Sequence, residues 1–209
     1  MVVGGLDGRK HAREHQHVLD GWLLDGVTHV CDGIHHVAPW CTPNMVTVVG
    51  NVARFTGVAL FALRRAPVAV VLLTALGIYL DNVDGHLARR TDRVTAFGDL
   101  LDHGTDWAWG VALAVVYLVV WASPERTWVS VLVLVLLGLY TLQFGVLESL
   151  YHRRCPAEAG TGASTAFTKK LASWGTPAAL AFGMRPAMGN VVLAAVTLSF
   201  IWVCYYPTR

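Results

Sequence analysis

The sequence predicts an all-α integral membrane protein, in which six transmembrane helices follow an amphipathic helix at the membrane surface. Three observations support this prediction. Hydrophobic residues make up 55% of the chain and charged residues only 14%, which is far from the composition of an ordinary soluble domain. The hydrophobic residues come in runs of about 17 to 22, the length that crosses a bilayer as a helix. Lysine and arginine gather at alternate connections between these runs, as the positive-inside rule expects.

The first expected helix covers about residues 17–38 and has one hydrophobic face. Val18, Trp22 and Val30 belong to a set that recurs at steps of three and four, whereas Asp25 and Asp32 lie mostly on other faces. The segment is too polar to span a bilayer. We therefore expect a helix that lies on the membrane surface or packs onto the transmembrane bundle, and these two arrangements are compatible.

Six hydrophobic stretches follow the polar N-terminal segment, which covers residues 1–40. They form an expected transmembrane domain at 41–209, joined by short connections. The expected spans are 43–63, 67–88, 97–121, 127–150, 165–184 and 187–206.

The basic residues predict the orientation of these spans. With the N-terminus in the cytoplasm, eleven lysines and arginines lie on the cytoplasmic side and four on the opposite side. Both termini are then cytoplasmic, and so is the connection between the second and third spans. The eleven are Arg9, Lys10, Arg13, Arg89, Arg90, Arg93, Arg153, Arg154, Lys169, Lys170 and Arg209, and the four are Arg64, Arg65, Arg126 and Arg185.

Four aspartates flank that cytoplasmic connection. Asp81 and Asp84 are three residues apart and Asp102 and Asp106 are four apart, so each pair shares one face of its helix. Because the two spans run antiparallel, the acidic faces can meet near the cytoplasmic mouth of the bundle. Carboxylates at membrane depth are costly, and like charges repel. A purely structural cluster would need matched cations, and the nearby ones are in the connection: Arg89, Arg90 and Arg93.

A divalent metal site explains the cluster better. Ligands that are all oxygen favour Mg²⁺ or Mn²⁺ over Zn²⁺, and two such ions would suit displacement at phosphorus. Neighbouring residues fit a phosphate ligand, because Gly85 lets backbone come close and Arg89 can grip a phosphate through its planar guanidinium. Ala88 is small, and Gly98 lets the two helices approach.

The spacing D-x2-D-G-x2-A-R-x8-G-x3-D-x3-D is matched at each fixed position from Asp81 to Asp106. It resembles the signature of the CDP-alcohol phosphotransferases, also called CDP-alcohol phosphatidyltransferases. The segment Thr42-Pro43-Asn44-x-x-Thr47 resembles the first helix of that family. The resemblance extends over about residues 38–206 and includes the six helices.

The resemblance implies a catalytic transmembrane domain with a specific reaction. An acceptor hydroxyl attacks the β-phosphorus of a CDP-linked substrate, and CMP leaves. Asp81, Asp84 and Asp102 are then metal ligands, and Asp106 is both a ligand and the general base. The residues implied to bind the CDP part are Asn44, Thr47, Asp81, Gly85, Ala88, Arg89 and Gly98.

Members of that family differ in which partner carries CDP. The runs Ala88-Arg89-Arg90-Thr91 and Asp102-His103-Gly104-x-Asp106 resemble the choline/ethanolamine branch, which joins CDP-choline or CDP-ethanolamine to diacylglycerol. The chain is much shorter than typical eukaryotic members of that branch. The alternative is therefore kept that CDP-diacylglycerol reacts with a polar alcohol such as inositol phosphate, glycerol phosphate or serine.

Several further polar residues are candidates for the acceptor side. His103 could hydrogen-bond an aspartate or the acceptor. Arg54 lies near the middle of the first span, where arginine rarely lies unpaired, and Glu148 is its candidate partner. Four cations on the aspartate side could bind the phosphate of a phosphorylated acceptor. Alternatively, they anchor the chain at the membrane edge. They are Arg153, Arg154, Lys169 and Lys170.

A different functional class stays open, namely a transporter or channel whose acidic cluster binds cations. It explains the carboxylates but not Gly85, Ala88, Arg89 and Gly98 at their spacing, and it predicts no CMP release. The net charge of +2 gives no indication of nucleic-acid binding. The expected partners are a CDP-linked substrate, a lipid in the bilayer and, as a candidate, a second copy of the chain.

Overall fold

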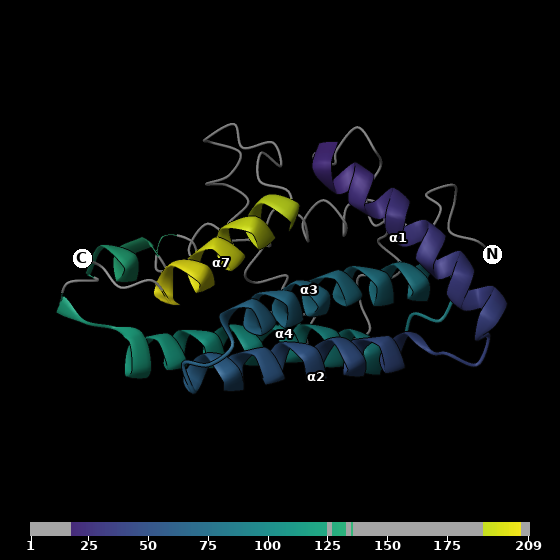
Figure 1. The fold of residues 1–209 in the computed structure, drawn as a ribbon. Helices are drawn as coiled ribbons and strands as arrows, with labels where there is room; N and C mark the ends of the chain where they lie inside the picture. The colour runs from purple at the N-terminus through teal and green to yellow at the C-terminus, as the bar shows by residue number, and fades with distance from the viewer. Residues whose placement is uncertain (1–17, 125–126, 133–134, 136–189, 206–209) are drawn as a thin grey trace, which may run out of the picture.

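The computed structural model describes residues 18–124, 127–132, 135 and 190–205, and within these ranges every regular element is a helix (Figure 1). The all-α prediction is confirmed for this part of the chain. In order, the elements are α1 (Val18–Val37), α2 (Pro43–Ala62), α3 (Pro67–Arg90), α4 (Ala96–Val116), the π-helix η2 (Tyr117–Trp121) and α7 (Asn190–Tyr205).

Three of the described helices are long and apolar enough to cross a membrane. They are α2, α3 and the continuous helix Ala96–Trp121, and they match the first three predicted spans. The shorter apolar helix α7 occupies the region of the sixth predicted span. The fourth and fifth predicted spans lie mostly outside the described residues, so the total of six stays a prediction.

Threonines begin two of the spanning helices. Thr42 Oγ1 accepts a hydrogen bond from Met45 N at 3.3 Å, and Pro43 occupies the first turn of α2. Thr95 Oγ1 likewise accepts from Gly98 N at 3.0 Å at the start of α4. Both are N-cap arrangements that satisfy a free backbone donor. Only residues 91–95 separate α3 from α4, so these helices run antiparallel as expected.

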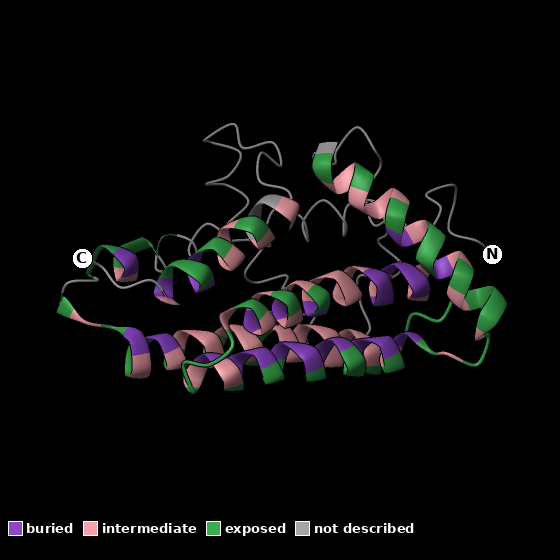
Figure 2. Ribbon diagram, in the orientation of Figure 1, coloured by how far each residue is buried: buried purple, intermediate pink, exposed green. Residues whose placement is uncertain are grey.

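Glycines allow α2 and α3 to pack closely. A Cβ on Gly77 would lie 2.8 Å from the carbonyl oxygen of Gly50, and one on Gly50 would lie 3.1 Å from Leu80 Cβ. Small residues at a crossing let helix backbones approach in this way. Figure 2 shows the buried residues of α2 along the side that faces its neighbours, which places the polar residues of that side inside the bundle.

The helix α1 crosses one end of α3 (Figure 1) and packs onto it. Val27 and Cys31 are fully buried against Val83 and Leu87. On the outer side of α1, Trp22 is 69% exposed. Of the two expected arrangements, packing onto the bundle is therefore observed. At the other end of the bundle α7 packs against residues of α2, α3 and η2, in a cluster that includes Phe61, Val70, Tyr117, Trp121, Phe200 and Ile201.

Candidate active site

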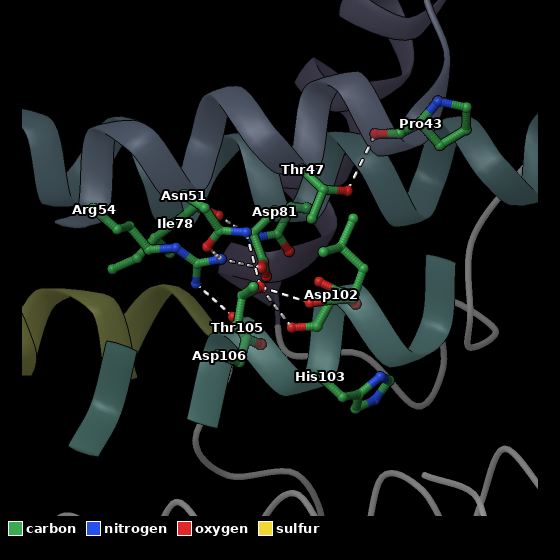
Figure 3. Close-up of polar contacts among 12 residues, drawn as sticks. Pro43, Thr47, Asn51, Arg54, Ile78, Asp81, Asp102, His103, Thr105 and Asp106 are labelled. Atoms are coloured by element: carbon green, nitrogen blue, oxygen red, sulfur yellow. Dashed lines mark hydrogen bonds and ion pairs between the residues drawn. The ribbon is translucent and has the colours of Figure 1, made fainter. Parts of the chain in front are cut away.

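Three aspartates from α3 and α4 converge on one point inside the bundle (Figure 3). Asp81, Asp102 and Asp106 each offer a carboxylate oxygen, and these oxygens all lie within 4.8 Å of one another. The acidic faces of the two helices therefore meet, as the spacing of the aspartates predicts. Three carboxylates at this distance repel one another strongly unless a cation lies between or beside them.

The fourth aspartate, Asp84, lies one turn beyond Asp81 on α3 and is only 3% exposed. It interacts electrostatically with Asp102 and Asp106. Both of its carboxylate oxygens are buried, and neither accepts a hydrogen bond of ordinary geometry within the described residues, although Thr47 and the backbone of Gly85 lie close enough to interact with it. A buried carboxylate with such weak hydrogen bonding is expensive, so this side chain is suited to an external cation.

A buried arginine from α2 reaches the cluster from the other side. Arg54 is 3% exposed; its Nη1 lies 2.5 Å from Asp106 Oδ1 and its Nη2 lies 3.0 Å from Asp81 Oδ1. The guanidinium thus bridges α3 and α4 (Figure 3). The sequence marked Arg54 as unusual but suggested Glu148 as its partner. Glu148 lies outside the described residues, and Arg54 pairs with two of the predicted metal ligands.

Two polar residues that the sequence did not single out complete this network. Asn51 Oδ1 accepts from Arg54 Nη2 at 3.0 Å, and Asn51 Nδ2 donates to Thr105 Oγ1 at 2.8 Å. A signal for both Asn51 and Arg54 was present. Asn44, Thr47, Asn51 and Arg54 recur at steps of three and four, so they share one face of α2.

The four candidate metal ligands fit a hard divalent cation. All four candidate ligands are carboxylates, the type that Mg²⁺ and Mn²⁺ prefer. The buried oxygens of Asp84, which accept no hydrogen bond of ordinary geometry among the described residues, supply the observation that favours a bound ion over a set of internal ion pairs. Asp81, Asp102 and Asp106 offer oxygens close enough to share one ion, and Asp84, which interacts electrostatically with Asp102, would complete the set of four.

A family model described as CDP-alcohol phosphatidyltransferase matches residues 40–203, which is most of the chain. The chain belongs to this family. The family match and the converging aspartates agree, because the family motif is the segment that carries Asp81, Asp84, Asp102 and Asp106. Family membership also favours a transferase over the cation transporter that the sequence left open.

Three curated relatives illustrate the similarity. Cholinephosphotransferase 1 of Gallus gallus is 33% identical over 96 residues, 41% of this chain and 26% of that protein. The Homo sapiens protein of the same name is 34% identical over 94 residues, 40% of this chain and 22% of that protein. Archaetidylinositol phosphate synthase of Pyrococcus horikoshii is 38% identical over 65 residues, 31% of this chain and 34% of that protein.

These matches are partial. The chain spans only about a quarter of the length of the two cholinephosphotransferases. No solved structure gives a significant match to the chain. The similarity to cholinephosphotransferases agrees with the choline/ethanolamine branch that the motif residues indicate.

The residues expected to bind the CDP part lie on the same three helices, at the end nearest the connection between α3 and α4. Thr47 is buried and donates to Pro43 O at 3.1 Å. A Cβ on Gly98 would lie 2.9 Å from Asn44 Oδ1, so Gly98 allows α4 to approach α2. A Cβ on Gly85 would lie 3.2 Å from Arg89 Nη1, and the Arg89 guanidinium therefore covers this glycine. Ala88 is half-buried beside Arg89.

The acceptor-side candidates are less close to the cluster. His103 Nδ1 lies 3.3 Å from Asp99 Oδ1 and 2.9 Å from Asp99 O, and Figure 3 shows its ring away from the aspartates. These contacts are with Asp99, which is outside the cluster, so a hydrogen bond from His103 to one of the four aspartates or to the acceptor stays a prediction. The other four candidates, Arg153, Arg154, Lys169 and Lys170, lie outside the described residues.

The helix α1 contacts the C-terminal part of α3, where the motif residues lie. His86 is fully buried, and its Nε2 lies 3.1 Å from Thr28 Oγ1 on α1. Arg90 Nη2 lies 2.6 Å from Asp32 Oδ1, also on α1. One of the cations near the aspartates in sequence is therefore engaged by α1, and the internal cation of the cluster is Arg54.

Proposed function

We propose that this chain transfers a phospho-alcohol group from a CDP-linked donor to a hydroxyl acceptor and releases CMP. One observation supports this most strongly: the family motif brings Asp81, Asp102 and Asp106 together, with the buried Asp84 one turn away. The family match over residues 40–203 supports the same reaction class. We further propose that activity depends on Mg²⁺ or Mn²⁺, with two ions as the starting expectation.

Each motif residue has a role in this proposal. Asp81, Asp84 and Asp102 hold the metal, which when bound neutralises the pyrophosphate and stabilises the leaving oxygen. Asp106 accepts the proton of the acceptor hydroxyl. The hydroxyl oxygen forms a bond to the β-phosphorus, the bond from that phosphorus to the bridging oxygen breaks, and the electron pair leaves with CMP. Gly85, Ala88 and Arg89, with Asn44, Thr47 and Gly98, position the CDP part.

The favoured substrates are CDP-choline or CDP-ethanolamine with diacylglycerol. The residues around Arg89 and Asp102 within the motif support this choice, and so does the similarity to cholinephosphotransferases. The alternative is CDP-diacylglycerol with a polar alcohol such as inositol phosphate, glycerol phosphate or serine. The similarity to an archaetidylinositol phosphate synthase supports the alternative, and Arg153, Arg154, Lys169 and Lys170 would then bind the acceptor phosphate.

The membrane arrangement is part of the proposal. Six transmembrane helices would leave both termini on the same side of the membrane. The distribution of basic residues suggests that this side, which also carries the aspartates, is the cytoplasmic one, where water-soluble CDP compounds are present. Trp22 and Val37 on the outer side of α1 are exposed, which suits a helix whose outer face rests in the membrane interface. We also propose that the chain forms a homodimer, although no contact among the described residues bears on this.

The deciding experiment measures CMP release by the purified full chain. A panel pairs CDP-choline, CDP-ethanolamine and CDP-diacylglycerol with diacylglycerol, inositol phosphate, glycerol phosphate and serine. We expect one pair to release CMP, a chelator to stop the reaction, and Mg²⁺ or Mn²⁺ to restore it. Asp81→Asn, Asp84→Asn and Asp102→Asn should each lose most activity. Cation uptake into proteoliposomes without CMP release from any pair would favour the transporter.

A further inference from the structure

We infer that Arg54 takes the place of a second metal ion, so that the site holds one divalent cation together with one fixed guanidinium. This inference rests on the proposed function and deepens it. The starting expectation for the four aspartates is two ions. The structure shows that one pair of carboxylates, Asp81 and Asp106, already has an internal cation. The other group includes the buried carboxylate of Asp84, which accepts no hydrogen bond of ordinary geometry among the described residues.

The Asp81–Asp106 side of the cluster is occupied by Arg54. Its two terminal nitrogens lie 2.5 Å from Asp106 Oδ1 and 3.0 Å from Asp81 Oδ1. A metal ion bridging these two carboxylates would have to lie beside a guanidinium at hydrogen-bonding distance from both of them. Like charges at this separation repel, and Arg54 itself is buried, so this position disfavours a second ion.

The guanidinium is held in place by more than its ion pairs. Asn51 Oδ1 accepts a 3.0 Å hydrogen bond from Nη2, and the Trp109 ring centroid lies 5.6 Å from Cζ. Gly77 makes room for the side chain, because a Cβ there would collide with Arg54 Cγ. An arginine with this many constraints does not readily withdraw when a metal ion arrives.

Near Asp84 the cluster has no cation from the described residues comparable to Arg54. Asp84 is 3% exposed, and its two carboxylate oxygens accept no hydrogen bond of ordinary geometry in the described part of the chain; Thr47 and the backbone of Gly85 interact with it only at longer range. Its nearest charged neighbours include Asp102, which only adds negative charge. One metal ion held by Asp84, Asp102 and Asp81 would satisfy the buried carboxylate. Asp106 would remain bonded to Arg54 through Oδ1, as a positioned base and not as a metal ligand.

The test counts bound ions. The full chain, purified in detergent and stripped with a chelator, is titrated with Mn²⁺, and free Mn²⁺ is followed by its EPR signal. We expect one bound ion in the wild type, two in Arg54→Gln and one in Arg54→Lys, which keeps the charge. Asp84→Asn should lose the single ion, whereas Asp106→Asn should keep it. Arg64→Gln, which removes a cation after the far end of α2, should stay at one.

Two bound ions in the wild type would overturn the inference, and so would one ion in both the wild type and Arg54→Gln. If Arg54→Gln fails to fold, the wild type, Arg54→Lys, Asp84→Asn and Asp106→Asn still decide the question. Failure of the proposed function looks different. A wild type that binds two ions and releases CMP leaves the transferase in place without this inference, whereas a chain that releases no CMP from any substrate pair contradicts the function whatever the ion count.

Discussion

Asn51 on α2 and Thr105 on α4 are joined by a hydrogen bond of 2.8 Å from the amide Nδ2 to the hydroxyl Oγ1. The Thr105 hydroxyl also donates to its own helix, at 2.7 Å from Leu101 O and 3.1 Å from Asp102 O. Asn51 in turn accepts from Arg54. The bond therefore fixes the backbone next to Asp102 and Asp106 relative to the arginine that pairs with Asp106.

Thr105→Val should destabilise the protein by about 1–3 kcal/mol, because it leaves the Asn51 amide without its partner in a protected site. Thr105→Ser keeps the hydroxyl and should cost much less. Unfolding of the purified proteins in detergent, followed by circular dichroism, compares the two variants. Equal losses in Val and Ser would mean that side-chain packing at this position matters and the hydrogen bond does not.

Gly98→Ala should weaken the contact between α4 and α2. The new Cβ would lie 2.9 Å from Asn44 Oδ1 and 3.1 Å from Thr95 Oγ1, so the Asn44 side chain would have to turn away from its present position. Because Asn44 is a proposed nucleotide-binding residue, we expect the KM for the CDP donor to rise more than kcat falls. Steady-state kinetics of CMP release measure both.

The matched control is Gly104→Ala on the same helix. No atom lies within 4 Å of a Cβ at Gly104, and replacing a helical glycine by alanine gains up to about 1 kcal/mol in helix propensity. Unchanged kinetics and equal or higher stability are expected for this variant. A similar rise in KM for both variants would show that flexibility of α4, and not its approach to Asn44, controls donor binding.

Local patterns in the sequence were sufficient for the helices that carry the site. The predicted spans 43–63, 67–88 and 97–121 agree closely with α2, α3 and the helix Ala96–Trp121. A proline or a threonine begins each of these helices, and hydrophobic runs fill all three. The meeting of the acidic faces was also predictable. Spacings of three and four residues and a short connection leave antiparallel neighbours few other arrangements.

The partners of Arg54 could not be predicted in the same way. Periodicity places Arg54 on the face of α2 that bears Asn51, but which residues that face meets depends on how α2 crosses α3 and α4. That crossing is set by contacts distant in sequence, such as Gly50 against Gly77. The contact between Thr28 and His86, 58 residues apart, depends on tertiary packing for the same reason.

Cys31 predicts a loss of stability at alkaline pH. Burial raises the pKa of its thiol from an ordinary 9.0 to about 11, against a smaller lowering by Arg90. The folded protein therefore holds this proton more tightly than the unfolded chain does. The resulting stability is fully present below pH 9 and is lost as the pH rises through 11. Denaturant unfolding between pH 8 and 11 should show this extra decline relative to Cys31→Ala, whose curve lacks the thiol contribution.

The proposed orientation predicts which side of the membrane reaches the connection between α3 and α4. Val94 is exposed in that connection. In a chain without Cys31, Cys41, Cys155 and Cys204, Val94→Cys should react with an impermeant maleimide only after the cytoplasmic side is opened. Arg65→Cys, in the connection between α2 and α3, should react in sealed cells. The reverse pattern would place the aspartates on the outer side and contradict access from the cytoplasm.

Asp106→Asn should separate the proposed base from the metal ligands. If Asp106 accepts the proton of the acceptor hydroxyl, the substitution should reduce turnover by roughly 10²- to 10⁴-fold, the usual share of general base catalysis. Binding of the CDP donor should change much less, because Asp81, Asp84 and Asp102 remain. Asp102→Asn should instead weaken metal and donor binding together. Equilibrium binding of the CDP donor and single-turnover CMP release, measured on both variants, separate these effects.

The pH dependence of single-turnover release adds an independent readout. An asparagine cannot take up a proton, so the residual activity of Asp106→Asn should increase with pH as solvent hydroxide replaces the missing base, more steeply than wild-type activity does. Asp102→Asn retains Asp106 and should keep the wild-type profile at saturating metal. If Asp106→Asn binds the donor as poorly as Asp102→Asn does, Asp106 acts chiefly as a ligand. The base would then have to be another group, and His103, one residue beyond Asp102 on α4, would be the next to replace.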